Sequence, residues 1–380
     1  MNQQIKSVLD SISYPVSGDK SHLDHPEDLI FHRGHHGALL ALKSMVDAST
    51  DSSNIFLKYD GYPSLIVGNN DNGKFSIMDK HMFNKKDMTG RQVFSPQDFM
   101  QYDANRGANR EDLYGIIQNI WNGLEKECKG IKGYIWGDLL FGQQLTPIDG
   151  EFTFKANPNG LTYKVVEKSP IGKLINGKNG GMAVHQQLDV YATDTKQATS
   201  LNGGIGQLKN NSDVAIIGCN LPSNMNVTLD DNTVNSVFSM IQSKSTLVDS
   251  FLSSSPIGQK SFSQIFMVYV NRKIVAGNVS NMLNGLREFV QSRKYAPNTI
   301  NALIQYLNDN LEGLQALFTI WTMLYNLKMN IVDQINVVMM NAPIKAYLDD
   351  GTMAHEGYVT NGIKLVDRMG FSRQNLSANA

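Results

Sequence analysis

The spacing of apolar residues changes near residue 225, and this change constrains the fold more than any other feature of the chain. Before it, short apolar runs alternate with glycine, proline and asparagine, a pattern typical of strands and hairpins. From about 232 to 345 the apolar residues recur at helical spacing. Strand-like sequence returns at 357–366. We therefore expect an α+β fold whose chain leaves a sheet domain, forms helices and comes back.

The length of the chain agrees with this division. At 380 residues it exceeds the usual size of one hydrophobic core, so two domains or one domain with a large insertion are expected. The predicted parts are an N-terminal helical lead at 1–50, a core at 51–224, a helical insertion at 225–350 and a return to the core at 351–380.

Composition argues against several classes of protein. The chain is 41% hydrophobic and 18% charged with a formal net charge of -1, which favours neither a disordered protein nor one that binds nucleic acid through overall charge. No run of about 18 uncharged apolar residues predicts a membrane span, and the N-terminus lacks a signal-peptide pattern. Cys128 and Cys219 have no metal-type spacing, which favours a reducing compartment.

Lys58 carries the strongest chemical signal. It ends a predicted strand at 55–58 and begins Lys58-Tyr59-Asp60-Gly61, whose Asp-Gly pair is typical of a turn. A lysine that attacks a phosphate must be neutral, and because its ordinary pKa is about 10.4, nearby cations or burial have to lower it. Taken alone, the four residues also fit an ordinary turn with a solvated lysine.

Four more segments follow this motif in a defined order. They are Trp136-Gly137-Asp138-Leu139-Leu140-Phe141, Leu161-Thr162-Tyr163-Lys164-Val165, His355-Glu356-Gly357-Tyr358-Val359 and Ile363-Lys364-Leu365-Val366-Asp367-Arg368. The series resembles the motifs of the covalent nucleotidyltransferases: ATP-dependent DNA ligases, RNA ligases and mRNA-capping guanylyltransferases. The resemblance covers roughly 55–221 and 352–376. It implies an antiparallel-sheet nucleotidyltransferase core, like the ATP-grasp-like adenylation domain of ligases, with a large, mainly helical insertion.

The resemblance assigns the nucleotide-binding roles residue by residue. Lys58 would form the lysyl phosphoramidate, and Asp60 and Gly61 complete its motif. Asp138 corresponds to the acidic residue that contacts ribose, although glutamate is more common there in the family. Tyr163 corresponds to the aromatic residue that stacks on the base.

Two residues near the C-terminus complete the implied catalytic set. Glu356 corresponds to the acidic residue associated with the catalytic metal, Mg²⁺, and Lys364 to the lysine that holds the α-phosphate. Together a lysine and Mg²⁺ neutralise the charge that develops as pyrophosphate leaves. The chain departs from the family at Pro63, close to where many ligases carry an arginine, and its last motif offers one lysine rather than two.

These assignments predict an ATP-dependent polynucleotide ligase that forms lysyl-AMP on Lys58 and transfers it to a nucleic-acid 5′-phosphate. RNA is favoured over DNA because only residues 369–380 follow the last motif, too few for an OB domain. GTP-dependent guanylyl transfer is the second possibility. The third is a phage structural or nucleic-acid-binding protein that keeps the fold without turnover.

Three segments also resemble an uncharacterised protein family of tailed bacteriophages: residues 25–31, the lysine motif and residues 366–372. This resemblance implies a location in the cytoplasm of a bacterial host, with association with the virion as the other setting. No membrane partner is expected, and the sequence indicates no oligomeric state.

Three other patterns in the sequence suggest a phosphate-binding loop, a metal site or a hydrolase. The glycine-rich segment at 172–179 is close to a phosphate-binding P-loop, but Asn179 stands where serine or threonine is required, so we expect a basic loop. The histidines between 22 and 36 have no carboxylate or cysteine at ligand spacing and are expected to be structural. Asp138 and Glu356 could instead form the acid/base pair of a hydrolase, which leaves both lysines without a role.

Overall fold

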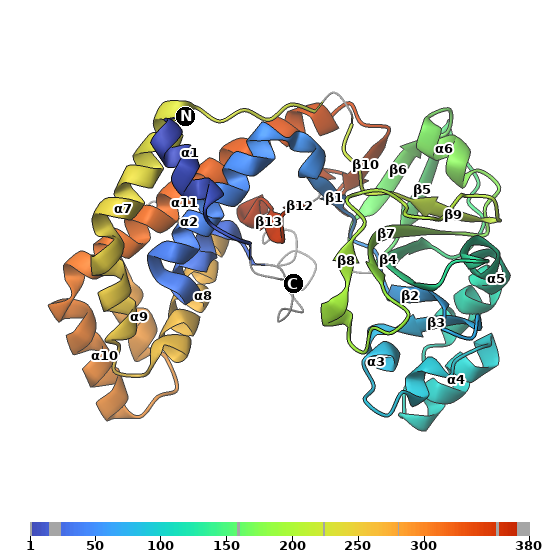
Figure 1. Cartoon of the computed structure of the whole chain (residues 1–380), viewed down its shortest axis with the longest axis horizontal. Coiled ribbons are helices and arrows are strands. Elements are labelled where there is room, and N and C mark those ends of the chain that lie inside the picture. The colour runs from blue at the N-terminus through green and yellow to red at the C-terminus, as the bar shows by residue number, and fades with distance from the viewer. Residues whose placement is uncertain are drawn as a thin grey trace.

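The computed structural model describes residues 2–14, 24–157, 160–222, 225–279, 281–354 and 357–370. The chain forms a helical lobe and a β lobe, and a three-stranded sheet lies between them (Figure 1). Helices and antiparallel sheets are both prominent, so the expected α+β class is confirmed.

The helical lobe combines the N-terminal helices with those of the predicted insertion. In it, α2 (Leu29–Thr50) packs against α7 (Asp231–Ser253), and both contact α11 (Leu311–Met339). The other helices of this lobe are α1 (Gln3–Asp10), α8 (Gln259–Val275), α9 (Leu286–Gln291) and α10 (Pro297–Asp309). Searched over the described residues, the chain has no helix with the length and apolar character that a bilayer crossing requires.

Gly34 interrupts α2 and fixes how this helix meets α7. Its φ of +56° lies in the left-handed region that favours glycine, and a Cβ there would collide with the carboxylate of Asp249 on α7. The kink allows both the backbone N–H of His35 (2.9 Å) and its imidazole Nδ1 (2.5 Å) to bond to Asp249. A glycine inside a helical pattern therefore marks a contact between helices.

The β lobe contains a six-stranded sheet in the order β3-β2-β4-β7-β8, with β9 beside β7. Its strands are β2 (Ser64–Asn69), β3 (Phe75–Asp79), β4 (Gly133–Phe141), β7 (Gly180–Leu188), β8 (Thr199–Ser200) and β9 (Val214–Ile217). The pairing of β7 with β9 is parallel and the other pairings are antiparallel. Short helices of this lobe are α3 (Lys80–Phe83), α4 (Pro96–Asn105) and α6 (Pro170–Ile175).

Helix α5 (Glu111–Cys128) covers one face of this sheet. Phe75 of β3 packs edge-on against Trp121 of α5, and the Asn69 side-chain amide donates to the carbonyl of Cys128 (2.6 Å). Figure 1 places α5 at the outer side of the β lobe and β8 at the side toward the helical lobe.

A four-stranded sheet in the order β11-β10-β6-β5 adjoins the larger one. It consists of β5 (Glu151–Lys155), β6 (Thr162–Val166), β10 (Ile344–Tyr347) and β11 (Met353–Ala354). Strand β10 lies inside the range 225–350 that the sequence led us to expect as helical. It joins β6 because Ile344 and Ala346 alternate with less buried residues and enter the core.

The three-stranded sheet joins distant parts of the chain. Its strands are β1 (Phe56–Lys58), β12 (Gly357–Thr360) and β13 (Ile363–Leu365), all antiparallel. Leu57, Tyr358 and Leu365 lie side by side in register and are buried. The Tyr358 hydroxyl donates to the side-chain oxygen of Asn336 on α11 (2.7 Å), so this sheet is attached to the helical lobe.

Candidate functional site

Lys58 and Lys364 lie on the same face of the three-stranded sheet. In the register, Phe56 is opposite Val359, Val359 is opposite Lys364, and Lys58 is opposite Gly357. Directly opposed residues point to the same side of a sheet, as do alternate residues of one strand. The two lysines therefore share the face that is turned away from the buried row of the sheet.

The ammonium of Lys58 acts electrostatically on that of Lys364. Burial, and after it the nearby ammonium of Lys58, lower the pKa of Lys364, while Asp24 acts in the opposite direction. Within the described part of the chain, neither lysine forms an ion pair at salt-bridge distance. Two cationic groups on one face form a site suited to an anion such as phosphate.

The loop that follows Lys58 rests on strand β4. The Tyr62 N–H donates to the carbonyl of Leu139 (3.0 Å), and the Leu139 N–H donates to the carbonyl of Pro63 (3.0 Å). A Cβ on Gly61 would lie 2.6 Å from the Cβ of Asp138, so the backbone can approach β4 this closely only at a glycine. Gly61 thus brings the lysine motif directly against Asp138.

Tyr163 supports the same loop from the core. Its hydroxyl accepts a hydrogen bond from the Asp60 N–H (2.7 Å), and the Asp60 carboxylate lies against Gly160. The Tyr163 ring is 1% exposed and stacks on Phe154 at 5.3 Å. In this structure the ring holds the lysine loop in place, and the base-stacking role implied by the resemblance stays a prediction.

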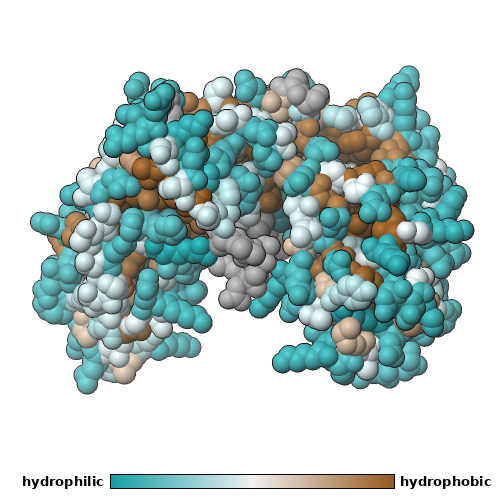
Figure 2. Space-filling view, viewed as in Figure 1, coloured by the Kyte–Doolittle hydropathy of each residue, from teal (hydrophilic) through white to brown (hydrophobic). Residues whose placement is uncertain are grey.

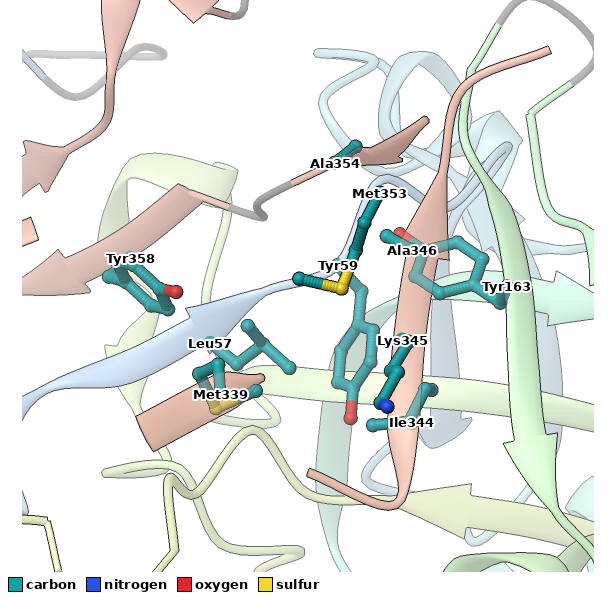
Figure 3. Close-up of a pocket in the computed structure, with 10 residues that line it drawn as sticks. All are labelled: Leu57, Tyr59, Tyr163, Met339, Ile344, Lys345, Ala346, Met353, Ala354 and Tyr358. Atoms are coloured by element: carbon teal, nitrogen blue, oxygen red, sulfur yellow. The ribbon is translucent and has the colours of Figure 1, made fainter. Parts of the chain in front are cut away.

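A small cavity lies behind the lysine loop (Figure 3). It is lined by Leu57, Tyr59, Tyr163, Met339, Ile344, Lys345, Ala346, Met353, Ala354 and Tyr358. Its volume of about 30 Å³ is roughly that of one water molecule, so a nucleotide cannot enter it.

Asp138 has a neighbour that the sequence did not reveal. A bulge between Trp136 and Gly137 sets two residues of β7, His185 and Gln186, opposite Trp136. The imidazole Nε2 of His185 lies 3.6 Å from the Asp138 carboxylate, and its ring centroid is 5.6 Å from that of Trp136. Nothing in the alternation of β7 residues indicates a bulge, so His185 could not be assigned to this site from sequence.

The predicted metal ligand Glu356 lies outside the described residues, as does His355. The next residue, Gly357, is opposite Lys58 in the sheet. Searched within the described ranges, the structure brings no three His, Cys, Asp or Glu side chains together as a metal site.

Residues 20–380 match a protein family described as a family of unknown function (DUF6267). The chain belongs to this family. No curated protein and no solved structure matches it.

The matched region of this DUF6267 chain includes a buried charge cluster, which connects Glu27 and Asp28 with Lys328 and Arg368. Glu27 accepts hydrogen bonds from Lys328 of α11 (2.6 Å) and Arg368 (3.0 Å), and Arg368 also donates to Asp28 (3.0 Å). Burial alone would raise the pKa of Glu27, but Lys328 and Arg368 outweigh it and lower the pKa to about 2. The segments 25–31 and 366–370, recognised separately in the sequence, therefore meet in space. Lys364 is tied to the same region, because its N–H donates to the carbonyl of Asp24 (2.9 Å).

The other sequence patterns lie in structural settings. Gly172 and Lys173 belong to α6, and a strand rather than a helix begins at Gly180, unlike a P-loop. Of the histidines before residue 37, His35 pairs with Asp249, and burial followed by the charge of Arg368 lowers the pKa of His25.

Proposed function

We propose that this protein is a covalent nucleotidyltransferase of the polynucleotide-ligase type, with Lys58 as the residue that accepts the nucleotide. The observation that supports this most directly is the common sheet face of Lys58 and Lys364, which are far apart in the chain. The close packing of Gly61 against Asp138 brings two further predicted residues together at the loop that follows Lys58.

The proposed reaction begins with attack of the neutral Lys58 Nζ on the α-phosphorus of ATP. The N–P bond forms, the bond between the α-phosphorus and the bridging oxygen breaks, and pyrophosphate leaves with its electron pair. As the N–P bond forms, the nitrogen loses one of its protons to solvent, which gives the phosphoramidate. An oxygen of a nucleic-acid 5′-phosphate then attacks the same phosphorus, which releases the lysine and leaves an adenylylated 5′ end.

The roles of the neighbouring residues follow from their charges and positions. Lys364 would hold the α-phosphate, since its ammonium lies on the face of the nucleophile. Asp138, whose side chain is 19% exposed, would accept hydrogen bonds from ribose hydroxyls. Asp60 and Gly61 would keep the loop in the position that presents Lys58.

We propose that Mg²⁺ binds through a protein carboxylate and the phosphates of the nucleotide together. Magnesium is usually held by one or two carboxylates together with substrate phosphates and water. Glu356, next to Gly357 in the chain, is the carboxylate we propose for it. When bound, the ion would supply charge neutralisation on the phosphates.

Covalent labelling tests the proposal. The protein is incubated with Mg²⁺ and either ATP or GTP carrying a labelled α-phosphate, and the label that survives denaturation is measured. We expect label from ATP that is lost in acid, as a phosphoramidate requires, and that disappears in Lys58→Ala. Lys155→Ala is the matched control, because Lys155 also ends a strand but pairs with Asp349 at 2.7 Å.

The outcomes separate the candidate functions. Label from GTP alone would assign guanylyl transfer, and equal label in Lys58→Ala would show that the nucleophile is wrong. No label on folded protein from either nucleotide would contradict the enzyme and favour a phage protein that keeps the fold without turnover. Chasing the labelled protein with 5′-phosphorylated RNA or DNA identifies the acceptor.

A further inference from the structure

The face of the six-stranded sheet opposite α5 carries aromatic and polar side chains and one lysine that the proposed reaction does not use. Trp136 and Asp138 alternate with the residues of β4 that face α5, so both point to this side. At one end the face is closed by Phe83, which packs edge-on against Tyr134 at 5.4 Å. Beyond that contact Trp136 is partly exposed.

Trp136 is held in a fixed orientation. Its indole N–H donates to the hydroxyl of Ser64 on β2 (2.6 Å), which satisfies the polar atom of the side chain inside the protein. The faces of the ring are available for contacts with other groups. The ammonium of Lys80, the first residue of α3, lies 5.7 Å from the ring centroid.

The bulge adds polar and aromatic groups beside this ring. His185 is 32% exposed and tilts against Trp136 at 56°. Gln186 lies opposite Trp136 and, on its other side, opposite Ser200 of β8. The row therefore runs from an indole through an amide to a hydroxyl, groups that stack on bases and hydrogen-bond to their edges.

We infer that this surface, defined by Lys80, Trp136, His185, Gln186 and Ser200, binds single-stranded nucleic acid. A preoriented ring with an adjacent imidazole offers a flat apolar face to an unpaired base, and Lys80 offers a charge to its phosphate. A duplex would not fit this chemistry, since its bases are already stacked and paired. The surface adjoins Asp138 but does not depend on Lys58, so the inference stands apart from the proposed transfer reaction.

Part of this surface lies toward the helical lobe, because Ser200 belongs to β8 (Figure 1). Figure 2 shows the molecule hollowed between the two lobes, with mostly hydrophilic residues along the hollow. A hydrophilic border suits a ligand with a solvated, charged backbone, as a single strand has.

Intrinsic fluorescence gives a direct test, because the protein has three tryptophans. Trp121 is 5% exposed and Trp321 is 0% exposed, so quenching by a stacked base reports on Trp136. We would titrate the full chain with short oligothymidylate and with oligouridylate, in EDTA and without nucleotide, and follow quenching and the anisotropy of a labelled oligonucleotide. The expected result is quenching on binding, which Trp136→Leu removes together with a roughly tenfold loss of affinity.

A matched pair of lysine variants separates this surface from general charge. Lys74 also lies over an aromatic ring, with Nζ 5.0 Å from the Phe94 centroid. Lys80→Gln should weaken binding and reduce the slope of log K against log salt by about 0.7, the value for one phosphate of a single strand. Lys74→Gln should leave both unchanged.

The inference is overturned if wild-type fluorescence is not quenched, or if Lys80→Gln and Lys74→Gln behave alike. It is also overturned if duplex binds as tightly as single strands. If circular dichroism shows that Trp136→Leu does not fold, the inference is tested by the quenching of wild-type fluorescence and by the comparison of Lys80→Gln with Lys74→Gln. Lys58→Ala is expected to bind normally, so loss of labelling and loss of strand binding are distinguishable results.

Discussion

Replacing Lys328 with methionine should destabilise the protein strongly, because it removes a charge from a fully buried pair. The Lys328 Nζ lies 2.6 Å from Glu27 Oε1, and both side chains are 0% exposed. Methionine has a similar length, so the change removes charge with little loss of packing. Breaking a buried ion pair from one side costs about 3–5 kcal/mol. Because Glu27 keeps Arg368 at 3.0 Å, we expect about 3 kcal/mol, the lower end of that range.

Urea unfolding followed by tryptophan fluorescence measures this effect near the cluster itself, since the Trp321 indole donates to Asp28 (2.9 Å). With an m value of about 3 kcal/mol/M, the upper end of the range for small proteins, the midpoint of the fluorescence transition should fall by about 1 M urea. Lys155→Met is the control, because its pair with Asp349 is exposed and is worth about 0–1 kcal/mol.

A double variant sharpens the test. In Glu27→Gln with Lys328→Met, both charges of the pair are gone, and Asp28 and Arg368 remain as a balanced pair at 3.0 Å. We therefore expect the double variant to lose less stability than the sum of the two single variants. If Lys328→Met shifts the midpoint no more than Lys155→Met, or the losses simply add, the cluster does not stabilise the fold in the way argued.

Three further predictions concern the site and its surroundings. Gly61→Ala should lower the melting temperature and abolish covalent labelling. Its methyl would lie 2.6 Å from the Cβ of Asp138 on β4, at a cost of about 1–3 kcal/mol. Gly115→Ala, with open space around it, should change neither the melting temperature nor the labelling. Lys58→Met should raise the pKa of Lys364 in an NMR titration because it removes a neighbouring positive charge, and an unchanged pKa would contradict the shared face. The pKa of Glu27, lowered from 4.5 to about 2, implies a contribution to stability that is complete above pH 4.5 and lost as pH falls toward 2. Unfolding free energy measured over that window should therefore fall more for wild type than for Glu27→Gln.

Several local features of the proposed site could be predicted from the sequence. The sequence predicted a strand ending at Lys58 and another containing Lys364, and both strands are present. It also predicted a turn at Gly61, where the loop packs against Asp138. Strand ends and turns can be predicted in this way because periodicity and turn chemistry are local properties of the chain.

Sequence alone determined the α+β class, the strands that carry Lys58 and Lys364, and which residue types could attack or hold a phosphate. Tertiary structure decided which of those residues meet. It paired β1 with β12, set His185 beside Asp138 through a bulge, and buried Glu27 against Lys328 and Arg368. Strand partners, bulges and buried ion pairs depend on contacts between segments far apart in the chain, and no local pattern records them. The order of motifs that singled out Lys58 is therefore a property of the sequence, while the cationic face it shares with Lys364 exists only in the folded chain.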